Sequence, residues 1–232
     1  MRLNFKKFQL VLLLSIIISC KKQVEHLDTT ILVLGNSMTI HSPDGTLGWY
    51  GNWGMAASSK EKDYIHILES KLHTSVTPVN IVAWEANHRG FDLSALDSYL
   101  NKGPDIVIIR LGENIQDLNG LATSLNKLID HIVENVPDAK VLITGTFWPG
   151  PSVNRIFAQV AAQRNISFIH LAQLYNQENI SVIGATVMSA DGVSYKITNK
   201  DVANHPGDIG MQHIADEILL GLKSILNKTI SK

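Results

Sequence analysis

The sequence is almost free of cysteine: Cys20 is the only one among 232 residues. A chain with a single thiol forms no internal disulfide and cannot build a metal site from several thiolates. The charges are balanced, with 20 basic and 21 acidic side chains, so the basic excess of nucleic-acid-binding proteins is missing. These shortages exclude a disulfide scaffold, a thiolate metal centre and a nucleic-acid partner. We also expect no cofactor.

The N-terminus has the pattern of an export signal. Basic residues at Arg2, Lys6 and Lys7 precede an apolar run, residues 8–18, which is too short for a stable membrane-spanning helix. The run ends in Ile-Ile-Ser-Cys, which resembles the lipobox of bacterial lipoproteins, with Cys20 at the lipidated position. An ordinary signal peptide with an incidental cysteine is the alternative.

This resemblance implies an exported protein tethered by lipid at Cys20, on the periplasmic side or on the cell surface. We expect three parts: a lipoprotein signal peptide at residues 1–19, a lipidated tether at residues 20–29, and a folded domain at residues 30–232.

Strand and helix patterns alternate along the folded domain. Amphipathic helical stretches separate five short strand-like runs, at residues 31–34, 76–83, 105–110, 140–144 and 167–169. Such alternation favours right-handed crossovers and a parallel sheet covered on both faces. The sequence therefore predicts an α/β fold, a flavodoxin-like three-layer α/β/α sandwich with a five-stranded parallel sheet. A small hairpin or loop strand is expected at residues 192–197.

Polar residues follow several of the predicted strands. Ser37 follows the first strand, Glu85 the second and Asn114 the third, while His205 precedes the last amphipathic helix. The carboxyl ends of parallel strands meet at one sheet edge, where open α/β proteins bind their ligands. Ser37 alone has a simpler interpretation as a helix cap.

Three short blocks resemble the SGNH (GDSL-type) hydrolases. They are Gly35-Asn36-Ser37, Gly112-Glu113-Asn114 and His205-Pro206. The first block departs from the family, which usually has Gly-Asp-Ser. The resemblance implies Ser37 as nucleophile, His205 as general base and then acid, and an oxyanion hole formed by the Ser37 N–H and the Asn114 amide. This chemistry needs no metal.

The acid of the catalytic triad is displaced in this sequence. The family usually has it three residues before the histidine, where this chain has Val202, and Asp201 lies one residue earlier. We predict Asp201 as the third catalytic residue. A Ser-His dyad oriented by a backbone carbonyl is the alternative. Asp208 is interpreted as a first-turn acid of the last helix.

The block after the second strand lacks the glycine whose N–H usually completes the oxyanion hole. We expect the main-chain N–H of Glu85 or Ala86 to replace it. The Glu85 side chain has other possible roles, as a polar rim contact or as the ion-pair partner of Arg89 or Arg110.

Four tryptophans lie in or beside the loops of this edge. We expect Trp53 to pack in the core, and we expect Trp49, Trp84 and Trp148 to contact substrate by stacking on a sugar ring or gripping an acyl group.

The preferred function is a serine esterase that hydrolyses an ester on a carbohydrate or similar small substrate, and we expect the ester to be an O-acetyl group. The alternatives are an acyltransferase or a lipid or thioester hydrolase on the same residues, and a glycan-binding lipoprotein with a vestigial site. A phosphate-binding module is less consistent with the sequence, because the first loop lacks the glycines that cradle phosphate.

Overall fold

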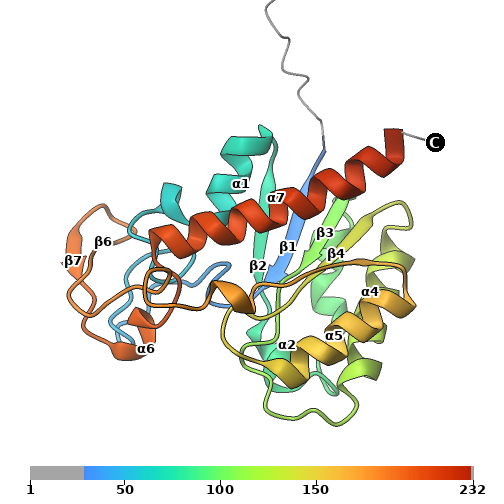
Figure 1. The fold of residues 1–232 in the computed structure, drawn as a ribbon, viewed down its shortest axis with the longest axis horizontal. Helices are drawn as coiled ribbons and strands as arrows, with labels where there is room; N and C mark the ends of the chain where they lie inside the picture. The colour runs from blue at the N-terminus through green and yellow to red at the C-terminus, as the bar shows by residue number, and fades with distance from the viewer. Residues whose placement is uncertain (1–28, 231–232) are drawn as a thin grey trace, which may run out of the picture.

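The computed structural model describes residues 29–230 (Figure 1). The predicted signal peptide, the lipidation site at Cys20 and nearly all of the tether lie outside the described residues. Across the described part of the chain, no helix has the length and apolar character needed to cross a bilayer.

A five-stranded parallel sheet forms the centre of the domain, as predicted, with the strand order β2-β1-β3-β4-β5. Strands β1 and β3, in the middle of the sheet, are apolar runs because a sheet covered on both faces buries both sets of side chains. Their bounds are β1 Ile31–Gly35, β2 Val76–Asn80, β3 Ile106–Ile109, β4 Lys140–Thr144 and β5 Ser167–Ile169.

Helices cover both faces of this sheet and make three layers (Figure 1). Successive residues of β1 point to opposite faces. Ile31 and Val33 pack in the cluster that contains α1 and α7, whereas Leu32 and Leu34 pack in the cluster that contains α4 and α5. The helices are α1 Tyr64–Leu72, α2 Val82–Ala86, α3 Asp97–Leu100, α4 Leu121–Asn135, α5 Pro151–Gln163, α6 Lys200–Ala203 and α7 Asp208–Ile230, with 3-10 turns η1 Lys60–Lys62, η2 Leu93–Leu96 and η3 Ala172–Leu174.

Two element boundaries differ from the sequence prediction. The second strand ends at Asn80 rather than at residue 83, because the Asn80 side chain accepts a hydrogen bond from the Val82 N–H at 3.0 Å and turns the chain into α2. In the sequence, Ser58 and Glu61 match a capping box that predicts a helix start near Ser58. Helix α1 begins instead at Tyr64, since buried Asp63 caps it by accepting from the His66 N–H at 2.8 Å.

A small hairpin lies beyond the β2 side of the sheet, where the sequence predicts a hairpin or loop strand (Figure 1). It consists of β6 Thr186–Met188 and β7 Ser194–Lys196, which pair antiparallel. It is joined to the loop after β1 by the Met188 N–H, which donates to the Ser58 carbonyl. The chain then enters α6, which leads to His205.

Candidate active site

Ser37 lies in a tight turn where β1 leaves the sheet. The Thr39 and Ile40 N–H groups both donate to the Asn36 carbonyl, which closes the turn. Gly35 is required here, because a Cβ at this position would overlap the Thr39 side chain. No hydrogen-bond acceptor for the Ser37 N–H is found within residues 29–230, and Ser37 lines the pocket.

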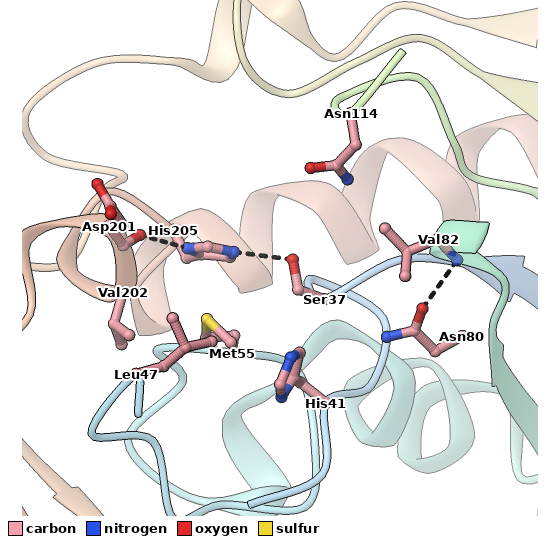
Figure 2. A pocket seen from close by; sticks show the side chains of 10 residues that line it. All are labelled: Ser37, His41, Leu47, Met55, Asn80, Val82, Asn114, Asp201, Val202 and His205. Carbon is pink, nitrogen blue, oxygen red and sulfur yellow. Dashed lines mark hydrogen bonds between the residues drawn. The ribbon is translucent and has the colours of Figure 1, made fainter. Parts of the chain in front are cut away.

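His205 faces Ser37 from the loop that joins α6 to α7 (Figure 2). Its Nε2 lies 2.8 Å from the Ser37 Oγ, and its Nδ1 lies 2.8 Å from the Asp201 main-chain oxygen. A carbonyl only accepts hydrogen bonds, so Nδ1 carries the proton and Nε2 accepts from the serine hydroxyl. The ring is 6% exposed, and burial lowers the pKa of His205 to about 4. At neutral pH the ring is therefore an uncharged base.

The Asp201 side chain is not placed as predicted. Its main-chain carbonyl, rather than its carboxylate, holds the imidazole. The reason is helical geometry: carbonyls in α6 point along the axis towards later residues, while side chains point outward. Asp201 is exposed, and no carboxylate of the described residues accepts a hydrogen bond from the His205 ring. The structure thus has the dyad arrangement that the sequence analysis left as the alternative.

Asn114 faces the pocket from the loop after β3, across from His205 (Figure 2). Its Nδ2 donates to Glu85 Oε2 at 2.6 Å. An amide nitrogen carries two hydrogens. One is engaged by Glu85, which leaves the other for a ligand above Ser37.

Glu85 lies beneath Asn114 rather than in the pocket wall. Its carboxylate is 1% exposed and accepts from the side-chain amides of Asn36 and Asn114 and from the Gly112 N–H. From the end of β2 and the start of α2, the residues that line the pocket are Asn80 and Val82, not Glu85 or Ala86. The expectation of a main-chain oxyanion donor at Glu85 is therefore not supported by this placement.

Neither arginine considered as a counter-ion pairs with Glu85. Arg89 binds Asp117 at 2.5 Å, and buried Arg110 binds Glu113 at 2.7 Å. Burial and the neighbouring negative charge of Glu113 raise the pKa of Glu85.

The tryptophans are placed differently from the prediction. Trp49 and Trp84 are 0% and 1% exposed and belong to the two cores, so neither can stack on a substrate. Trp53 is also buried, as expected. Trp148 reaches the site as a support for the histidine loop: its ring packs edge-on against His205, and its Nε1 donates to the Asn204 carbonyl at 2.9 Å.

The pocket above Ser37 has a volume of about 200 Å³. Sites for drug-sized ligands are larger, about 300–1,000 Å³, so this pocket suits a small group. Its wall is largely apolar, and sequence reasoning missed most of it because its members come from separate loops without a shared motif. These residues are His41, Leu47, Met55, Asn80, Val82 and Val202.

Clusters of three or more histidine, cysteine or acidic side chains that could hold a metal ion are not found among residues 29–230.

Similarity to known proteins is found at the level of structure. No protein-family model matches the chain, and no curated protein matches it in sequence. The esterase EstA from Pseudoalteromonas sp. is similar with a TM-score of 0.54 at 19% identity, over 86% of this chain and 100% of that one. A putative GDSL-like lipase from Bacteroides ovatus gives 0.55 at 14% identity, over 84% and 98%.

A family two carbohydrate esterase from Clostridium thermocellum, solved in complex with cellohexaose, is similar with a TM-score of 0.52 at 18% identity. The match covers 86% of this chain and 65% of the esterase, so the chain spans slightly less than two thirds of that protein. The chain thus has the α/β fold of the GDSL-type esterases and lipases.

Proposed function

We propose that the protein is a serine hydrolase that cleaves carboxylic esters, with Ser37 as nucleophile and His205 as its base. The observation that carries this proposal is the 2.8 Å contact between Ser37 Oγ and His205 Nε2 at the floor of a pocket. A serine hydroxyl is a poor nucleophile until a neighbouring base takes its proton. The lowered pKa of about 4 keeps His205 in the form that can do so.

The reaction proceeds through an acyl-enzyme. Ser37 Oγ attacks the ester carbonyl as its proton passes to His205 Nε2, and the tetrahedral intermediate then expels the alcohol, which takes that proton from Nε2. Water attacks the acyl-enzyme by the same steps and releases the acid and free Ser37. The Asp201 carbonyl accepts the Nδ1 hydrogen throughout and keeps the ring in register.

The negative oxygen of the intermediate is bound by two donors, the Ser37 N–H and the free Asn114 Nδ2 hydrogen. The Val82 N–H is a third donor near the pocket, but it donates to Asn80 Oδ1 in this structure. Its participation requires the Asn80 side chain to rotate away.

We propose a small acyl group, such as acetyl, on a carbohydrate as the substrate. Two observations support it: the pocket is small and largely apolar, and one similar structure is a carbohydrate esterase in complex with cellohexaose. The burial of Trp49 and Trp84 removes the argument for a tryptophan sugar platform. The short acyl group is better supported than the carbohydrate, because a long acyl chain is too large for the pocket.

A fluorophosphonate probe tests the nucleophile. We expect it to label the wild type and not Ser37→Ala, and equal labelling of both would refute the assignment. A series of p-nitrophenyl esters then tests acyl length, with kcat/KM expected to fall beyond short chains. Acetylated oligosaccharides, with and without an acceptor sugar, distinguish hydrolysis from acyl transfer. Glycan binding without cleavage of any ester indicates the vestigial alternative.

We further propose that the protein is exported and anchored through a lipid on Cys20. The supporting observation is the sequence pattern of residues 1–20. Metabolic labelling with an alkyne fatty acid is the test. The wild type should be labelled, and Cys20→Ala should be unlabelled and released from the membrane fraction.

A further inference from the structure

The Asn114 amide is held from below by a buried carboxylate. Glu85 Oε2 accepts its Nδ2 hydrogen at 2.6 Å, while Glu85 Oε1 accepts from the Gly112 N–H and from Asn36 Nδ2 at 3.1 Å. Every hydrogen-bond partner of Glu85 is therefore a donor. Because Glu85 is 1% exposed, its carboxylate is shielded from bulk water, which strengthens these contacts.

This arrangement fixes the direction of the second Asn114 hydrogen. An amide group is planar, so a short bond from one Nδ2 hydrogen to Glu85 sets the orientation of the other. Without it, the amide rotates about a broad, soft torsion. We propose that Glu85 is a positioning residue that orients Asn114 as an oxyanion donor, and that Asn36 is the neutral partner that allows Glu85 and Glu113 to lie together. The proposal rests on the function proposed above.

Asn36 supplies its amide to both acids. Its Nδ2 donates to Glu85 Oε1 at 3.1 Å and to Glu113 Oε2 at 2.7 Å, and its Oδ1 accepts from the Met38 N–H. An aspartate at this position would replace the donor by an oxygen and bring a third carboxylate against two others. This accounts for Asn36 where the family that the sequence resembles usually has aspartate.

The negative charge around Asn36 already exceeds the positive charge. Glu85 comes from α2 and Glu113 from the loop after β3, where Arg110 binds Glu113 at 2.7 Å. Other titratable groups near this cluster are Tyr64 of α1, whose pKa burial raises, and His205 across the pocket; Asp63 in turn lies near Tyr64, and His41 near His205. Within residues 29–230, one cation, Arg110, thus faces these two carboxylates, and an aspartate at position 36 would add a third carboxylate with no second cation to pair with.

A double-mutant cycle tests the link between Glu85 and Asn114. Glu85→Gln keeps the shape but offers one acceptor oxygen to three donors, so we expect kcat on an activated acetyl ester to fall at least about tenfold with little change in KM. If Glu85 acts through Asn114, the same substitution in an Asn114→Ala background changes kcat by less than about twofold. If the effects of Glu85→Gln and Asn114→Ala on kcat multiply in the double variant, the proposal is overturned. Ser37→Ala supplies the background rate.

Asp63→Asn is the matched control. Asp63 is also fully buried and accepts a main-chain hydrogen bond, from the Gly54 N–H at 2.9 Å, but it does not contact Asn114. Its effect on kcat should multiply with that of Asn114→Ala. Equal non-additivity for Asp63→Asn and Glu85→Gln would indicate general loosening of the site and would also overturn the proposal.

Asn36→Asp gives a second test that leaves Glu85 in place, should Glu85→Gln not fold. We expect reduced kcat at neutral pH, and a ratio of variant to wild-type kcat that rises as the pH falls from about 8 to about 5, because protonating one carboxyl restores a donor. A ratio of one, or one that does not change with pH, would overturn the role of Asn36. Fluorophosphonate labelling of wild-type Ser37 keeps this outcome separate from failure of the proposed function.

Discussion

The two sides of Ser37 are supported in different ways. On one side, His205 is held by a main-chain carbonyl, that of Asp201, four residues earlier in the chain. On the other side, Asn114 is held by a side-chain carboxylate from a separate element, Glu85, 29 residues away. One support is local and neutral, whereas the other is long-range and charged.

This difference predicts how each side tolerates substitution. A backbone carbonyl remains whatever side chain the residue carries, so the support of His205 is indifferent to the side chain at position 201. A carboxylate that accepts three hydrogen bonds is lost with its side chain, and burial makes the loss costly. The two sides should therefore respond unequally to removal of their supporting acids.

Removal of the base should have the largest effect. His205→Ala leaves Ser37 without a proton acceptor, and we expect kcat/KM to fall about 10⁴-fold. The measurement is hydrolysis of an activated acetyl ester, with circular dichroism as the control for folding. Retention of more than a tenth of the activity would exclude His205 as the base.

Asn114→Ala should be next in size. It removes one of two free oxyanion donors, which typically costs about 10²–10³ in turnover. The loss should appear in kcat rather than in KM, because the interaction forms with the negative oxygen of the transition state. A change confined to KM would show that Asn114 binds the substrate and does not act as an oxyanion donor.

The pH dependence of kcat/KM tests the pKa of His205. Because burial lowers the pKa of His205 to about 4, the acid limb of kcat/KM should lie near that value rather than near 6.5. Protonation inactivates the base, so a lower pKa extends activity to more acidic solution. At pH 5, a histidine with an unshifted pKa would leave only about one site in thirty neutral. An acid limb near 6.5 would contradict the lowered pKa of His205.

The same shift affects stability in a defined direction. Between about pH 4 and pH 6.5 the unfolded chain binds a proton at His205 that the folded chain does not. This group therefore makes the free energy of unfolding fall as the pH is lowered through that window. Chemical denaturation of the wild type and of His205→Asn across the window isolates the contribution.

Asp201→Ala should have the smallest effect. The carbonyl that holds His205 Nδ1 is retained and the lost carboxylate is exposed, so kcat/KM should stay within about threefold of wild type. Steady-state kinetics on the same ester measures it. A hundredfold loss would show that the carboxylate acts in catalysis, and the contrast with the Glu85 side would then disappear.

Much of the fold could be predicted from the sequence because strands such as β1 and β3 are continuous apolar runs. The runs at Lys140–Thr144 and Ser167–Ile169 were located to the residue. Boundaries set by side-chain hydrogen bonds were missed, as at Asn80 and Asp63, because a capping side chain looks like any other polar residue in a sequence. The tryptophans were misplaced for a related reason: a residue in a loop at the sheet edge can still be packed inward, as Trp49 and Trp84 are.

The sequence by itself determined the parallel sheet and the points where Ser37, Asn114 and His205 leave their elements, since strand and helix patterns depend on residues close together in the chain. The tertiary structure alone decided what holds those three residues. Asn36 and Glu113 are 77 residues apart and Asn36 and Glu85 are 49 apart, yet they share one buried cluster. The same holds for His205, whose contact with a carbonyl rather than a carboxylate follows from the direction of a single helical turn. Hydrogen-bond partners of buried groups depend on distances of a few tenths of an ångström between separate elements, and these arise only when the elements pack.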